Sequence, residues 1–264
     1  MSNKHQFLPR TKVLLKIKPF IPLCPKITLR LKYKKVIIKQ MSYFAIILGI
    51  LPGFAWLTFY LREDSRHPEP RKIIFFTFLL GGIATFIALY IEIFINSYFQ
   101  KFSISDYSSV SFLSFAFIEE FIKFFIVFWF VRKSKYFDEP VDAMIYTITI
   151  ALGFATIENI GATINQWNQY LEIGAIFHTV TLRFIGATLL HSLSSALVGY
   201  YWAKGIRSHD QIPFIFQGLV IATLLHAFFN YLIINGGAVI SSTMFLLIIG
   251  LFILNDFEKL KSIS

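Results

Sequence analysis

Long runs of apolar residues, separated by short polar loops, dominate the chain. Each run is about 20 residues long, which is the length that an α-helix needs to cross a hydrocarbon core of about 30 Å. The pattern predicts about seven membrane spans, at residues 42–61, 73–95, 111–131, 143–165, 181–203, 213–234 and 239–256. We expect an interfacial stretch at 166–180. The predicted fold class is an all-α, polytopic membrane helix bundle.

Composition supports this class and excludes others. The chain is 56% hydrophobic, with 31 Phe, and only 15% of its residues are charged, against roughly 25% in an average soluble protein. A soluble core cannot bury so much apolar surface, so the lipid bilayer is the expected surrounding. Because Cys24 is the only cysteine, an intrachain disulfide and a thiolate metal site are excluded.

The positive charge is confined to one end of the chain. Residues 1–40 hold 11 Lys and Arg and no acidic residue, whereas residues 41–264 hold 14 basic and 15 acidic residues. We therefore expect two parts, a basic N-terminal arm at 1–40 and a membrane domain at 41–264. Since the membrane domain is nearly neutral, the high net charge does not indicate a nucleic-acid partner.

The short loops predict the orientation in the cell membrane, because Lys and Arg accumulate in cytoplasmic loops. The loops at 62–72, 132–142 and 204–212, together with the C-terminal tail, hold 11 basic residues, and the alternate loops hold only Lys101. The C-terminus is therefore expected in the cytoplasm and Met41 outside. The arm conflicts with this orientation. A chain that starts at Met41 removes the conflict, and so does an arm that re-enters the membrane or an extra element before the first span. The basic arm is also suited to lying on anionic lipid.

Ionisable residues inside membrane spans are costly and usually functional. Counted from the cytoplasmic ends of their helices, four of them lie 12 to 15 residues deep, which is about 18–23 Å at 1.5 Å per residue. We therefore expect them to converge at one depth. These four are Glu119, Glu158, His191 and His226, and Glu120, Lys123 and Asn230 lie beside them in the third and sixth spans.

The residue types indicate hydrolysis of a carbonyl bond. Adjacent carboxylates with an imidazole can deprotonate a water, and a second imidazole with an amide can stabilise an oxyanion. Alternatively, two histidines and one glutamate can hold zinc with an open position for water, and the candidate ligands are His191, His226 and Glu158. Neither arrangement uses a Ser, Thr or Cys nucleophile.

Other interpretations remain open at this point. A single mid-span histidine often serves only to bridge helices. A proton- or cation-coupled transporter also needs carboxylates and histidines in the membrane, and a non-catalytic adaptor is the third hypothesis. Four further polar residues lie near span ends or in loops, where snorkelling toward water explains them: Glu92, Asp142, His178 and Arg183.

Ordered motifs in the spans resemble those of the PrsW family of intramembrane proteases. Glu119-Glu120-Phe-Ile-Lys123 is similar to its E-E-x-x-K motif, and Gly153-Phe-Ala-Thr-Ile-Glu158-Asn159 to its second motif. His191 with Gly199, and then His226-Ala-Phe-Phe-Asn230, resemble the third and fourth, and Asp64 with Pro68-Glu69-Pro70 resembles a family loop. The likeness covers residues 43–256. The family is related to the CAAX prenyl endopeptidases.

The resemblance implies an endopeptidase that cleaves single-pass membrane proteins, such as the first-site cleavage of an anti-sigma factor. The family has been described both as glutamic-type and as metal-dependent, so zinc stays open. We expect Glu119 and His191 to activate the water, Glu120 to assist and Lys123 to tune the pair. We expect His226 and Asn230 to stabilise the oxyanion, and Glu158 to orient a histidine or the water.

Overall fold

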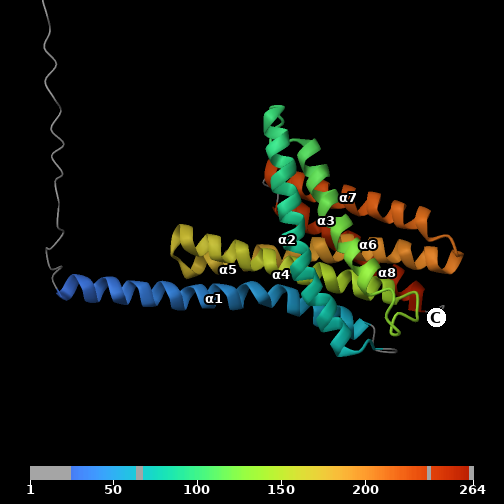
Figure 1. Ribbon diagram of the computed structural model, residues 1–264, viewed down its shortest axis with the longest axis horizontal. Helices are drawn as coiled ribbons and strands as arrows, with labels where there is room; N and C mark the ends of the chain where they lie inside the picture. The colour runs from blue at the N-terminus through green and yellow to red at the C-terminus, as the bar shows by residue number, and fades with distance from the viewer. Residues whose placement is uncertain (1–24, 64–67, 237–238, 262–264) are drawn as a thin grey trace, which may run out of the picture. The chain divides into compact units, whose positions relative to one another are not determined.

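The computed structural model describes residues 25–63, 68–236 and 239–261. Cys24 and Asp64 lie outside these ranges. The described residues form helices joined by short turns, and no strand occurs among them (Figure 1). The helices are α1 (Pro25–Glu63), α2 (Arg71–Lys101), α3 (Ser109–Phe130), α4 (Asp142–Tyr170), α5 (Ile173–Ile185), α6 (Ala187–Ser208), α7 (Gln211–Gly236) and α8 (Val239–Lys261). By its contacts the chain divides into two units, Met1–Gln40 and Met41–Ser264.

Within the described part of the chain, six segments are long and apolar enough to cross a membrane. They correspond to the predicted spans at 42–61, 73–95, 143–165, 181–203, 213–234 and 239–256. The seventh predicted span, 111–131, is α3. It is 22 residues long and strongly apolar, but it carries three charged residues, Glu119, Glu120 and Lys123, which set it apart from the other six. The prediction of an all-α membrane bundle is confirmed.

The predicted start of the fifth span was wrong. α4 continues to Tyr170, and Leu171 closes it in the left-handed conformation with φ 54°. α5 then occupies residues 173–185, so residues 166–180 are shared between two helices. Gly186 separates α5 from α6 with φ −110° and ψ −96°. The hydropathy pattern runs through Gly186 without interruption, so hydropathy alone does not indicate a boundary between two helices there.

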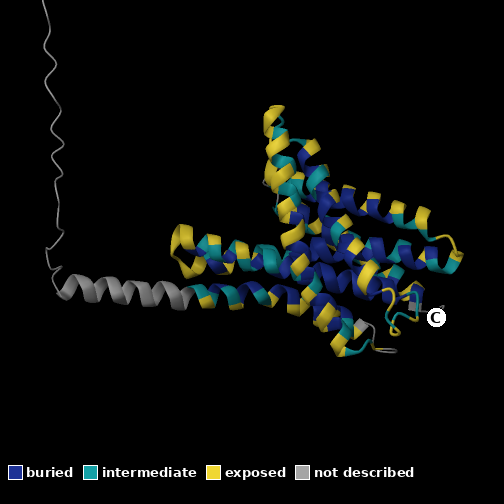
Figure 2. Cartoon of the chain, viewed as in Figure 1, coloured by how far each residue is buried: buried dark blue, intermediate teal, exposed yellow. Residues whose placement is uncertain are grey.

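The core lies around α4 and α6. α4 packs against α2 and α6, α6 packs against α7, and α3 packs against α2 and α7. Buried residues are concentrated where these helices meet (Figure 2). α4 is buried along most of its length, whereas α2 and α8 present many exposed Phe, Leu and Ile side chains. An exposed apolar surface of this kind is expected to face lipid.

Glycines set the closest helix contacts. At the crossing of α2 and α4, a Cβ at Gly153 would overlap the carbonyl oxygen of Phe78, and a Cβ at Gly81 would overlap that of Ile150. At the contact of α4 and α6, a Cβ at Gly199 would lie 2.7 Å from the carbonyl oxygen of Ala143. Small residues drive helix association in membranes because they let backbones approach closely. These contacts fix α2, α4 and α6 relative to one another.

We expect Gly153→Ala to destabilise the bundle by about 1–3 kcal/mol, because the added methyl group forces α2 and α4 apart. Gly161→Ala is the matched control on the same helix, since a Cβ there meets nothing within 4 Å. Unfolding by SDS titration in micelles, followed by tryptophan fluorescence, measures both. Equal unfolding midpoints for the two variants would contradict this account of the crossing.

Candidate active site

Four helices bring the predicted polar residues into one cluster. α3 carries Glu119, Glu120 and Lys123, α4 carries Glu158, α6 carries His191 and α7 carries His226. The side chains of His191 and His226 are 4% and 2% exposed. The expected convergence of these side chains is therefore seen in the fold. The catalytic role of each residue stays a prediction.

Among the residues of this cluster, Glu120 makes the most hydrogen bonds. Lys123 donates from Nζ to Glu120 Oε1 at 2.6 Å, and the side chains of this pair are 0–1% exposed. Ser194 and Ser195 of α6 donate hydroxyl hydrogen bonds at 2.9 and 3.2 Å to its two carboxylate oxygens. Nδ1 of His226 lies 2.8 Å from Oε1. These contacts join α3, α6 and α7 and leave the Glu120 carboxylate little capacity for a further partner.

Each histidine has one nitrogen held by a carboxylate. Because an ionised carboxylate only accepts hydrogen bonds, His226 donates from Nδ1 to Glu120, which leaves Nε2 without a proton in the neutral ring. His191 donates from Nε2 to Glu158 Oε2 at 2.8 Å, and its Nδ1 accepts from Lys123 Nζ at 3.2 Å. The two rings lie nearly perpendicular, with centroids 5.0 Å apart.

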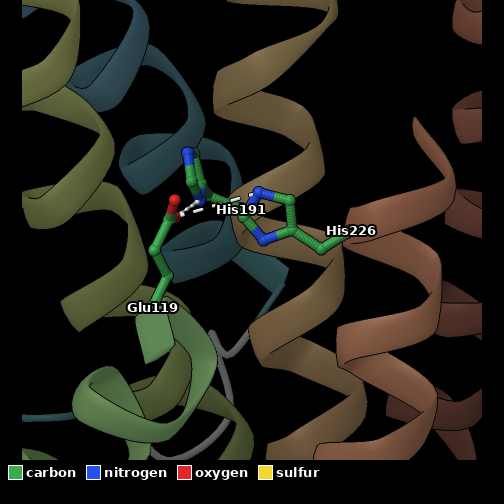
Figure 3. Close-up of side chains that lie close together, drawn as sticks. All are labelled: Glu119, His191 and His226. Atoms are coloured by element: carbon green, nitrogen blue, oxygen red, sulfur yellow. Dashed lines mark ion pairs between the residues drawn. The ribbon is translucent and has the colours of Figure 1, made fainter. Parts of the chain in front are cut away.

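Glu119 faces the other nitrogen of both rings. Its Oε2 lies 3.7 Å from His191 Nδ1 and 3.8 Å from His226 Nε2. Figure 3 shows its carboxylate pointing toward the two imidazoles from a third helix. Oε2 is buried and has no hydrogen-bond partner among the described residues. A buried carboxylate oxygen without a partner is costly, so this position is built for a ligand, a water or a substrate group.

The arrangement fits a metal ion. One ligand atom each from Glu119, His191 and His226 lie within 4.8 Å of one another. Each imidazole has its second nitrogen fixed by a carboxylate, as is usual for histidines that bind zinc. The carboxylate of the group is Glu119. Glu158, expected from the sequence as the carboxylate ligand, lies instead at the opposite nitrogen of His191, where it orients the ring.

Arg183 belongs to the surroundings of the site. It was expected to snorkel at a span end, but it donates from Nη2 to Glu158 Oε2 at 2.9 Å and from Nε to Asn159 Oδ1. Asn159 in turn donates to Thr188 Oγ1 at 2.9 Å. This network ties α4 to α5 and α6 beside the break at Gly186. Arg183 thereby fixes the carboxylate that orients His191.

The remaining expected residues lie apart from the cluster. Asn230 is half-buried one turn after His226, and it makes no hydrogen bond with a described residue. Asp142 does not snorkel, because its carboxylate accepts the backbone N–H groups of Asp138 and Glu139. His178 is exposed.

The sequence indicated the charged members of the site and missed their polar partners. The sequence pattern did not single out Ser194 and Ser195 as polar partners. Their positions three and four residues after His191, on the same helix face, were the available signal. Arg183 had a weaker signal, a lone guanidinium between Leu182 and Phe184.

Comparisons with known proteins agree with the motifs. A family model described as PrsW family intramembrane metalloprotease matches residues 69–255. The chain is 33% identical over 197 residues to Protease PrsW of Bacillus subtilis, which covers 72% of this chain and 83% of that protein. It is 28% identical over 190 residues to Protease PrsW of Geobacillus kaustophilus, with 72% and 79% covered. No solved structure matches the chain.

We expect Lys123→Met to destabilise the bundle by about 3–5 kcal/mol, because it leaves the Glu120 carboxylate buried without its cation. The double variant Glu120→Gln with Lys123→Met removes both charges and should recover part of the loss. The same SDS titration measures the two variants. If the double variant were less stable than Lys123→Met alone, the ion pair would not be the main role of Lys123.

Proposed function

Because the chain belongs to the PrsW family of intramembrane metalloproteases, we propose that Glu119, His191 and His226 form its hydrolytic centre. The chain is a multi-pass membrane peptidase, so the transporter and adaptor hypotheses are set aside. One observation carries the assignment. The unpartnered Oε2 of Glu119 lies 3.8 Å from His226 Nε2 and 3.7 Å from His191 Nδ1, which also accepts a hydrogen bond from Lys123.

In this proposal Glu119 binds the attacking water through Oε2. As the water oxygen bonds to the carbonyl carbon of the substrate, its proton passes to the Glu119 carboxylate. His191 assists at Nδ1, while Glu158 holds Nε2 and so keeps the ring in place. When the tetrahedral intermediate breaks its C–N bond, Glu119 returns the proton to the leaving amine.

In this proposal, residues of α7 stabilise the oxyanion of the tetrahedral intermediate. His226 presents Nε2 toward Glu119 because Glu120 holds Nδ1, and Asn230 follows one turn later on the same helix. Because Nε2 carries no proton in the neutral ring, His226 donates to the oxyanion only when both ring nitrogens are protonated, and the amide of Asn230 is the second proposed donor on this helix. Glu120 and Lys123 act as positioning residues, since their hydrogen bonds fix both histidines.

The same centre suits zinc. Glu119, His191 and His226 are the residues that would hold it, since their ligand atoms form one close group. When bound, zinc polarises a carbonyl and activates a water near neutral pH. The family description as metalloproteases favours this form of the site.

The substrate we propose is a single-pass membrane protein, with first-site cleavage of an anti-sigma factor as the model case. The centre is buried among helices that carry an apolar, exposed surface. A scissile bond must therefore reach it from within the bilayer. A transmembrane segment of a substrate protein meets that requirement.

Purified protein in liposomes should cleave a single-pass reporter built on an anti-sigma factor transmembrane segment. We expect Glu119→Gln and His226→Ala to lower kcat/KM by about 100-fold or more, because proton transfer and oxyanion stabilisation each contribute on that scale. Trp129→Phe, on the exposed end of α3, is the control and should cleave as the parent does. Parent-like cleavage by Glu119→Gln would exclude this centre.

A chelator decides between the two forms of the site. If the centre holds zinc, chelation should abolish cleavage by the parent, and added zinc should restore it. Metal analysis of the purified protein should then give one zinc per chain, and His226→Ala should lower that content. Full cleavage in chelator by metal-free protein would establish a glutamic-type peptidase.

For orientation we propose that the C-terminus is cytoplasmic. A fluorescent protein fused after Lys261 should fluoresce in bacterial cells, and alkaline phosphatase fused there should be inactive. The reverse is expected for fusions in the loop after Lys101, because the positive charges favour the other loops. Active phosphatase at the C-terminus would reverse the assignment.

A further inference from the structure

A cavity of about 410 Å³ lies between α2, α4 and α5 and reaches the candidate active site. Its volume is within the range of about 300–1,000 Å³ that is usual for ligand pockets. Its lining residues include Glu158, which bonds His191, and Phe154, whose ring centroid lies 5.4 Å from that of His191. The cavity therefore borders the hydrolytic centre through Glu158 and Phe154, both of which contact His191.

The crossing of α2 and α4 explains where this space comes from. The helices touch at Gly81 and Gly153, and Thr85 still donates to the carbonyl of Phe154 at 3.2 Å. Two turns after Gly153, a Cβ at Gly161 would meet nothing within 4 Å. Because the helices cross steeply (Figure 1), they separate beyond the contact and leave the space open.

The cavity opens on the apolar surface of the bundle. Phe86 and Leu89 of α2 line it and are 62% and 49% exposed. Gly161 on the opposite wall is exposed as well. An exposed apolar surface on a membrane bundle faces acyl chains, so an occupant can enter this cavity sideways from the bilayer.

Polar groups inside the cavity match an unwound polypeptide. Backbone N–H and C=O groups in a membrane need partners once a helix is broken. Glu92 supplies an acceptor, because its Oε1 is buried and has no partner among the described residues. Arg183 supplies a donor, since only Nη2 and Nε are used by Glu158 and Asn159 and its side chain is 22% exposed.

We propose that this cavity binds the unwound segment of a membrane-protein substrate next to its scissile bond. Glu92 accepts a backbone N–H of that segment, Arg183 donates to one of its carbonyl oxygens, and the bare surface of Gly161 leaves room for the chain. The proposal rests on the proposed function and adds the path and the conformation of the substrate. Glu92 and Gly161 are thus substrate-binding residues in a part of the bundle distinct from the hydrolytic centre.

A size series at Gly161 tests the proposal. Cleavage of the reporter should fall as the side chain at position 161 grows, least in Gly161→Ala, more in Gly161→Val, and about tenfold or more in Gly161→Phe, because a displaced scissile bond reacts slowly. Gly174 is the matched control, since it is also a helical glycine whose Cβ would meet nothing within 4 Å. Gly174→Phe lies on α5 away from the cavity lining and should cleave as the parent does.

Binding gives a readout that is separate from the chemistry. In the Glu119→Gln background, Gly161→Phe should weaken binding of the reporter, measured by energy transfer in liposomes, and Gly174→Phe should not. A photoreactive benzoylphenylalanine at Phe86, which is 62% exposed, should crosslink the reporter, whereas one at Leu247 of α8, which is 50% exposed and lies outside this cavity, should not.

The outcomes separate the two proposals. Unchanged cleavage and binding by Gly161→Phe, equal loss in Gly174→Phe, or crosslinking only from Leu247 would each overturn the cavity as the substrate site. SDS titration reports whether Gly161→Phe is folded. If it is not folded, cleavage by Gly161→Val and crosslinking from Phe86 test whether the cavity binds the substrate. Failure of the hydrolytic centre has another signature, which is parent-like cleavage by Glu119→Gln.

Discussion

The buried carboxylate of Glu120 is the group on which the rest of the site depends. Taking a charge out of water costs several kcal/mol, and only close opposite charge and well-formed hydrogen bonds offset that cost. Glu120 has both, from Lys123, Ser194, Ser195 and His226. Because these partners come from α3, α6 and α7, stabilising one charge also fixes three helices. The same contacts orient His226 directly and His191 through Lys123.

Two adjacent glutamates therefore differ because of their surroundings. Successive residues on a helix point about 100° apart. The Glu120 side chain therefore points toward its polar partners, while the Glu119 side chain points toward the two histidines. Glu120 has its hydrogen-bonding capacity filled, and Glu119 keeps a buried oxygen without a partner. A carboxylate whose hydrogen-bonding capacity is used by the protein can stabilise a site. A carboxylate with an oxygen left without a partner can bind and react with a water or a substrate group. This difference supports the proposed roles of the two glutamates, which the paired motif alone leaves undecided.

The arrangement of the helices stabilises the bundle and also leaves a cavity beside the candidate active site. The glycines at the crossing of α2 and α4 bring two backbones together, and the steep crossing then opens a cavity beyond them. Arg183 lines that cavity and donates a hydrogen bond to Glu158, the residue that orients His191. In the proposed function, this cavity links the lipid-facing surface to the hydrolytic centre.

The sequence by itself determined the membrane bundle, most span positions and the charged members of the site. Apolar runs of spanning length and charges inside them are costly in any other setting, so these features are visible along the chain. Helical spacing also placed Glu119, Glu158, His191 and His226 at one depth, since depth follows from counting residues. None of this required knowledge of which helices touch.

Only the tertiary structure decided the partners of those residues. Depth does not fix the rotation or the neighbours of a helix, so the bonds of Glu120 to Ser194 and Ser195 and the network of Arg183 were not readable from spacing. The same holds for the choice of Glu119 over Glu158 as the carboxylate that faces both histidines. The break at Gly186 was also hidden, because hydropathy averages over a glycine while backbone geometry does not. These features arise from close packing between distant segments, which a one-dimensional pattern cannot encode.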